Sequence, residues 1–163
     1  MAIPDYDEEL RSIGLVIEKA NEVERLLDEI IFAQINPNAS GQNFVLGNLL
    51  HNSIISFAGK VKLVLYINKK HNLGELNREN LHKLLNLRNA FAHNDMWDKF
   101  DVHEPEDENS DKELYIYMES MVGNGSIKRI RRDHAHSEVD VLYKSLKKQL
   151  ESNLEALNEK INI

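Results

Sequence analysis

Apolar residues recur every three or four positions through most of the 163-residue chain, and this spacing restricts the fold to packed helices. The longest case runs from about residue 5 to residue 34. The apolar positions that would share one side of that helix are Leu10, Ile13, Ile17, Ala20, Leu27 and Ile31. A helix with one apolar side is stabilised by burying that side, so the pattern predicts a mainly α protein.

Three further segments carry the same spacing. The second predicted helix runs from about Phe44 to Lys69 and is apolar over more than half its surface, which favours a central position. The third follows Asn77, a plausible N-cap, and ends near Asn94-Asp95. The last begins at Ser137 and keeps its apolar stripe as far as Ile161.

A segment from about 101 to 136 interrupts this pattern before the last helix. Seven of the thirteen residues from Asp101 to Glu113 are acidic, so we expect a solvated loop there. Two β-prone runs, 114–118 and 126–130, flank Gly123-Asn124-Gly125 and predict a two-stranded hairpin. The expected fold is a single domain over the whole chain, an up-and-down bundle of four to five helices with this small β-hairpin insertion.

Composition excludes several classes of site. The chain has no cysteine, which excludes disulfides, thiolate zinc sites, iron–sulfur clusters and cysteine nucleophiles, and we expect no metal and no cofactor. Its net charge of −7 argues against broad electrostatic affinity for nucleic acid. No segment approaches eighteen consecutive apolar residues, and the acidic start of the chain does not resemble a secretory signal. We therefore expect a cytoplasmic protein without a membrane span.

The third predicted helix contains the run Arg88-Asn89-Ala90-Phe91-Ala92-His93. It brings a permanent cation, an amide and a titratable imidazole into an otherwise apolar helix, where such groups are costly to bury. Asn89 and His93 share one face, but Arg88 points roughly 140° away from His93. Either the long Arg88 side chain bends back, or a second copy of the helix supplies the missing group across a twofold axis.

These residue types suit metal-independent RNA cleavage. Neutral His93 can take the proton from a ribose 2′-hydroxyl while Arg88 stabilises the charge that builds on the phosphorane. Asn89 can orient His93 or hold a phosphate oxygen. Because DNA lacks the 2′-hydroxyl, this chemistry selects RNA. On spacing alone a simpler alternative is favoured, in which Arg88 and His93 cap carbonyls and pair with carboxylates such as Asp95 or Asp98.

The run from Leu87 to Asn94 resembles the signature of the HEPN (higher eukaryotes and prokaryotes nucleotide-binding) superfamily: an arginine, a polar residue, three spacers and a histidine. In helix order the resemblance covers about residues 8 to 98. It implies a small helical bundle that forms a homodimer through the motif helices and, in many members, acts as a metal-independent endoribonuclease. By position, Arg88 and His93 match the catalytic pair and Asn89 the polar residue. Such a protein is expected to act on RNA, as the toxin of a toxin–antitoxin or phage-defence pair.

The run from Ser56 to Lys62 is also similar to the mannitol operon repressor branch of the same fold, whose members regulate. That similarity implies an alternative, a non-catalytic regulatory or interaction protein that associates with another protein. The net charge of −7 favours the same alternative, since phosphate binding relies on clustered cations.

Two smaller features carry weaker predictions. The densest basic patch in the sequence can contact phosphates or can simply offset the acidic loop; it consists of Lys128, Arg129, Arg131 and Arg132. His134-Ala135-His136 has the spacing of two metal ligands on an extended segment. Because no third ligand has a fixed place near this run, we expect an exposed loop there and no metal site.

Overall fold

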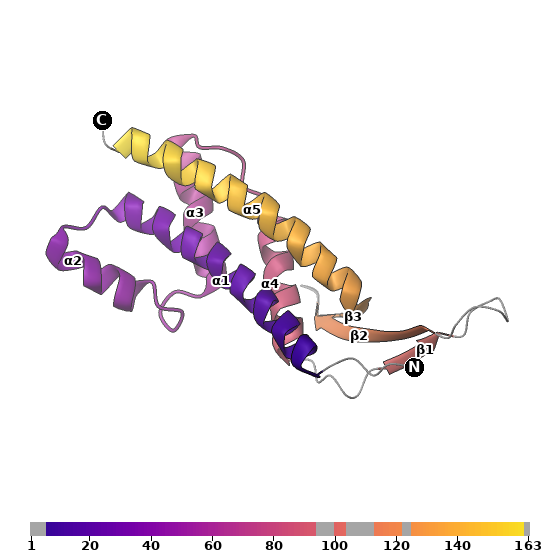
Figure 1. Ribbon diagram of the computed structural model, residues 1–163. Coiled ribbons are helices and arrows are strands. Elements are labelled where there is room, and N and C mark those ends of the chain that lie inside the picture. The colour runs from indigo at the N-terminus through magenta and orange to yellow at the C-terminus, as the bar shows by residue number, and fades with distance from the viewer. Residues whose placement is uncertain (1–5, 94–99, 104–112, 122–124, 162–163) are drawn as a thin grey trace. The chain divides into compact units, whose positions relative to one another are not determined.

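The computed structural model describes residues 6–93, 100–103, 113–121 and 125–161, which form five α-helices, one π-helical turn and a small sheet (Figure 1). In chain order the elements are α1 (Tyr6–Ile35), α2 (Ala39–Phe44), the π-helical turn η1 (Val45–Leu49), α3 (Phe57–His71), α4 (Arg78–His93), β1 (Phe100–His103), β2 (Glu113–Met121), β3 (Ile127–Arg131) and α5 (Arg132–Ile161). The predicted mainly α fold, with a β-hairpin before the last helix, is confirmed.

The chain divides into two compact units, and helices α1, α4 and α5 contribute residues to both. The first unit comprises Met1–Glu18 and Lys83–Val141, and the second comprises Lys19–His82 and Leu142–Ile163. Each has its own apolar interior. Fully buried residues of the first unit include Val16, Leu84, Ala135 and Val139, and those of the second include Val23, Leu27, Ile30, Val61, Val64, Leu146, Leu150 and Leu157. The single domain expected from the sequence stays a prediction.

Along α1 the predicted stripe is confirmed at Ala20, Leu27 and Ile31 and is wrong nearer the start of the helix. Leu10 is 47% exposed, and Ile13 and Ile17 are partly exposed, although all three were expected to be buried. The buried positions are Val16, Ala20, Val23, Leu26, Leu27, Ile30 and Ile31. Two stripes with helical spacing run next to each other in this sequence, and spacing alone does not decide which of them is covered.

The continuous helix predicted from Phe44 to Lys69 is wrong, because the stretch contains the end of α2 and the turn η1 and then a new helix that begins after the cap Ser56. Asn38 Oδ1 accepts a hydrogen bond from Gly41 N at 3.0 Å where α2 begins, and Ser56 Oγ accepts from Gly59 N at 3.3 Å where α3 begins. Side chains of this kind offer backbone N–H groups a partner outside the helix, so a helix starts anew at each one. The apolar periodicity runs through both segments and hides the break.

The predicted start of α4 is confirmed, and the predicted start of α5 is wrong. Asn77 Oδ1 accepts from Asn80 N at 3.0 Å and caps α4. Helix α5 begins at Arg132 instead of Ser137, and Ser137 Oγ lies within the helix, donating to the carbonyl oxygen of Asp133 at 3.1 Å. The predicted end of α4 at Asn94-Asp95 lies outside the described residues.

The sheet has one more strand than the sequence predicts. Strands β2 and β3 form the expected antiparallel hairpin, with Met118 opposite Ile130. Strand β1 pairs antiparallel with β2 on its other side, placing Phe100 opposite Ile116. Part of the segment predicted as an acidic loop is therefore strand, because a neighbouring strand offers hydrogen bonds that local composition does not reveal. The remainder of that segment, 104–112, lies outside the described residues.

In the second unit, a polar contact joins α1 to α5. Lys147 Nζ donates to Glu22 Oε1 at 2.7 Å, and the Tyr143 hydroxyl also donates to the Glu22 carboxylate. These two hydrogen bonds, that of Lys147 above all, hold the pKa of Glu22 below its ordinary value, and the Glu22 carboxylate raises the pKa of Lys147. The ion pair between Lys147 and Glu22 forms only at pH values at which Glu22 is ionised.

Replacing the cap of α4 tests how the helix that carries the motif begins. We expect Asn77→Ala to lower the free energy of unfolding by about 1 kcal/mol, since it removes the acceptor for Asn80 N. Asn77→Asp places a carboxylate oxygen where the amide oxygen of Asn77 lies and should unfold at nearly the same urea concentration as the wild type. Equal losses in the two variants, measured by urea denaturation, would contradict the capping role.

Candidate functional site

The residue spacing of α4 separates an apolar side from the polar residues of the motif. Its buried residues are Leu81, Leu84, Leu87, Ala90 and Phe91. Arg88 and Asn89 are half-buried beside this apolar side, and His93 is exposed at the last described position of the helix. Ala92, next to His93, is exposed as well. The motif therefore offers an imidazole to solvent and keeps its arginine partly covered.

Within the motif, Asn89 is hydrogen-bonded to Arg88, and no hydrogen bond joins Asn89 to His93 among the described residues. Arg88 Nη1 donates a hydrogen bond to Asn89 Oδ1 at 3.0 Å, which fixes the guanidinium next to its own helix. No hydrogen bond joins Arg88 to His93 among the described residues, in agreement with the angular separation that an ideal helix imposes. The alternative in which these residues pair with Asp95 or Asp98 concerns carboxylates outside the described residues.

Phe91, between the two ends of the motif, packs against the start of α5 in the first unit. The His136 ring meets the Phe91 ring edge-on with 4.6 Å between centroids, and the Arg132 guanidinium lies 5.5 Å from the Phe91 centroid. His136 is in turn hydrogen-bonded to Ser12 on α1. These contacts between aromatic rings and a cation hold the middle of the motif on α5.

The exposed loop expected at His134-Ala135-His136 is wrong, and sequence reasoning assigned no function to His136. His134-Ala135-His136 belongs to α5, where Ala135 is fully buried and His136 is half-buried. The sequence does contain a signal for the earlier start of α5. The spacing of its apolar stripe continues from Val139 back to Ala135 and Arg132. The two β-prone runs nearby favoured the prediction of an extended segment at residues 134–136.

The predicted basic patch is divided by its surroundings. Arg132 is only 7% exposed and faces Phe91, whereas Arg129 is exposed and lies 4.5 Å from the centroid of the Tyr117 ring. The Arg131 guanidinium binds Asp133 through two hydrogen bonds, of 2.5 and 3.1 Å, and lowers the pKa of that carboxyl. Lys128 is exposed on β3. These four side chains therefore do not offer one cationic surface.

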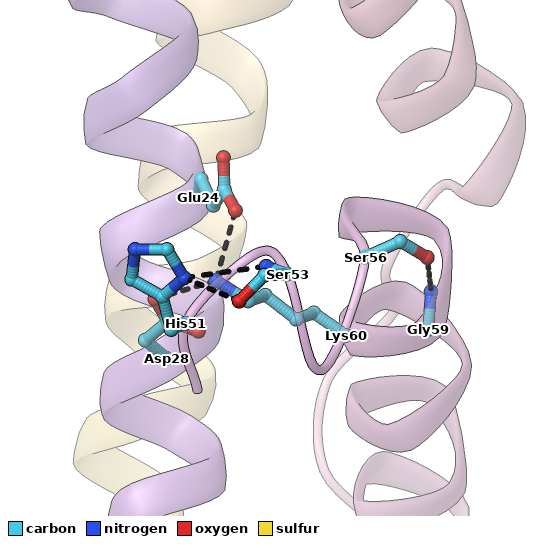
Figure 2. Close-up of polar contacts among 7 residues, drawn as sticks. All are labelled: Glu24, Asp28, His51, Ser53, Ser56, Gly59 and Lys60. Atoms are coloured by element: carbon cyan, nitrogen blue, oxygen red, sulfur yellow. Dashed lines mark hydrogen bonds and ion pairs between the residues drawn. The ribbon is translucent and has the colours of Figure 1, made fainter. Parts of the chain in front are cut away.

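In the second unit, a lysine near the start of α3 forms a buried cluster. Lys60 is 2% exposed, and its ammonium group donates to Glu24 Oε1 at 2.8 Å and to Asp28 Oδ2 at 2.9 Å. Figure 2 shows the Lys60 side chain leaving α3 and reaching towards these carboxylates on α1. The same view shows Ser56 capping Gly59 one turn earlier, so the run from Ser56 to Lys62 combines a helix start with an ion-paired lysine.

A cavity of about 400 Å³ adjoins this cluster, and Glu24, Asp28, Lys60, His51 and Asn52 are among the residues that line it. Burial raises the pKa of Asp28 despite the hydrogen bond from Lys60, which acts in the opposite direction. Asp28 Oδ1 is buried and accepts no hydrogen bond from the described protein atoms. Because two carboxylates share one ammonium group, removing that group leaves like charges facing each other.

Comparison of the chain with protein-family models, with curated proteins and with solved structures finds no match. In the described part of the chain, no group of three or more His, Asp or Glu side chains is arranged to hold a metal ion. None of the described helices is both long enough and apolar enough to cross a membrane.

Truncating Lys60 tests the buried cluster. We expect Lys60→Ala to lower the free energy of unfolding by about 3 kcal/mol, because Glu24 and Asp28 then lose their shared partner inside the protein. The control is Lys62→Ala on the same helix, whose exposed side chain should change stability by no more than about 0.5 kcal/mol. Urea denaturation measures both, and similar losses in the two variants would contradict the assignment.

Proposed function

We propose that the protein is a metal-independent endoribonuclease of the HEPN type, with Arg88 and His93 as its catalytic pair and Asn89 supporting Arg88. The observation that carries the proposal is the geometry of α4. An exposed imidazole lies at its last described residue, and a half-buried guanidinium, braced by an amide, lies five positions earlier. At 1.5 Å per residue the two positions are about 7.5 Å apart along the helix axis.

The proposed reaction needs one proton acceptor and one anion-stabilising group. The His93 imidazole accepts the proton of the ribose 2′-hydroxyl, and the 2′-oxygen attacks the adjacent phosphorus. The bond from phosphorus to the 5′-oxygen then breaks, and that oxygen leaves with a proton from an imidazolium or from water, so a 2′,3′-cyclic phosphate remains. Arg88 has five N–H donors, of which one is given to Asn89, and the others can bind the phosphorane oxygens.

A homodimer through α4 is part of the proposal. A single helix separates Arg88 from His93 by roughly 140°, so each site takes its arginine from one copy and its histidine from the other. The exposed Ala92 and His93 leave space for a second helix to approach. The same proposal includes a cytoplasmic location and a role as the toxin of a toxin–antitoxin or phage-defence pair, with an antitoxin as the protein partner.

One observation favours a second candidate, a catalytically silent regulatory or interaction protein of similar fold. In the described part of the chain, His93 has no hydrogen-bond partner that would fix its tautomer, whereas catalytic histidines are commonly oriented by such a partner. This candidate predicts stable association with another protein and no RNA turnover.

Incubation of the purified protein with single-stranded RNA in EDTA separates the two candidates. We expect the wild type to cleave RNA and to leave cyclic phosphate ends. His93→Ala should slow cleavage by about 100-fold or more, and Arg88→Ala by a similar factor. His134→Ala is the matched control, because this exposed histidine on α5 has no part in the proposed chemistry.

Intact RNA after incubation with the wild type would contradict the endoribonuclease and favour the silent protein. Cleavage that persists in His93→Ala would also contradict it, because the activity would then come from another site or from a contaminant. Equal folding of all variants is checked by their unfolding in urea.

A further inference from the structure

Helix α3 concentrates positive charge in a chain that is acidic overall. It contains four lysines and no acidic residue, although the chain has a net charge of −7. Lys60 is buried in its ion pairs, whereas Lys62, Lys69 and Lys70 are exposed. Between them Tyr66 is 67% exposed, a large fraction for an aromatic side chain on a packed helix.

These four exposed side chains share one side of α3, which is called its outer face below: Lys62, Tyr66, Lys69 and Lys70. At about 100° per residue, Lys62, Tyr66 and Lys69 fall within about 60° of one another, and Lys70 lies about 40° beyond Tyr66. From Lys62 to Lys70 the face extends about 12 Å along the axis at 1.5 Å per residue. The buried residues of the helix, Val64 among them, lie on the opposite side.

Ordinary structural roles do not account for the outer face. No ion pair involves Lys62, Lys69 or Lys70 among the described residues. Lysines near a helix end often bind its last carbonyl groups, but here Lys160 of α5 does so, donating to the carbonyl oxygens of His71 at 2.5 Å and Asn72 at 3.3 Å. The three lysines remain available to a partner in solution.

We propose that the outer face of α3 binds single-stranded RNA, with the lysines contacting phosphates and Tyr66 stacking on a base. Cationic side chains along a helix complement a phosphate backbone, and an aromatic ring between them suits unstacked bases. A duplex keeps its bases stacked on one another, so an exposed tyrosine selects single strands. The choice of RNA rests on the proposed function; the charge and the exposed ring are properties of α3 itself.

Equilibrium binding of a fluorescent single-stranded RNA at several salt concentrations tests the proposal. The measurements use His93→Ala protein throughout, so that the RNA stays intact. Removing three phosphate contacts in Lys62→Gln/Lys69→Gln/Lys70→Gln should reduce the slope of log affinity against log salt by about 2, at about 0.7 per contact. The control replaces Lys144 and Lys148, two exposed lysines of α5, by glutamine and should reduce neither affinity nor slope.

The stacking part of the proposal has its own pair of variants. Tyr66→Ala should weaken RNA binding by roughly 5-fold to 100-fold, because it removes the ring. Tyr66→Phe keeps the ring and should bind within about twofold of the parent protein. Equal losses in both variants would overturn the stacking contact.

Two results would overturn the RNA-binding face as a whole. One is a triple lysine variant whose affinity and salt slope equal those of the α5 control. The other is displacement of the RNA by phosphatidylserine vesicles at lower concentration than by unlabelled RNA, which would identify an anionic membrane as the preferred partner. These outcomes are separate from those that test the proposed function. RNA binding through α3 without RNA cleavage would refute the nuclease alone. Cleavage that depends on His93, together with normal RNA binding by the α3 variants, would refute the outer face alone.

Discussion

The buried ammonium group of Lys60 determines how α3 is used. Its hydrogen bonds to Glu24 and Asp28 join α3 to α1, and a lysine that is 2% exposed has no alternative partner in water. Once Lys60 faces inward, helical geometry turns Lys62 and Lys69 outward. One ion-paired lysine therefore separates a buried side of α3 from a cationic side, and the proposed RNA-binding face follows from that orientation.

A different constraint applies to α4, because the proposed nuclease needs two groups of this helix, Arg88 and His93, to meet on one phosphate. The helix keeps Arg88 and His93 apart, and Asn89 holds Arg88 in place instead of moving it towards the histidine. Phe91, in the middle of the motif, is fixed by Arg132 and His136. In the proposed homodimer a second copy of the helix supplies the missing group, and neither side chain has to leave its position.

Sequence periodicity predicts the helices well and their interruptions poorly. The bounds of α1 and the cap at Asn77 follow from local spacing and local hydrogen-bonding side chains. The break before Ser56 was missed because apolar spacing continues through it, and β1 was missed because strand pairing depends on a distant segment. For the candidate site, the residue types and the separation of Arg88 from His93 could be predicted. The contacts of His136 and Arg132 could not, since they depend on which helix packs against Phe91.

The shared site is tested most directly by mixing two inactive variants. If each site takes Arg88 from one copy and His93 from the other, a dimer of Arg88→Ala with His93→Ala contains one intact site and one site that lacks both residues. After random exchange of subunits, the mixture should recover about one quarter of the wild-type RNA cleavage, because half the dimers are mixed and each has one working site. A mixture that is no more active than either variant alone, prepared from a cleaving wild type, would contradict a site built from two copies.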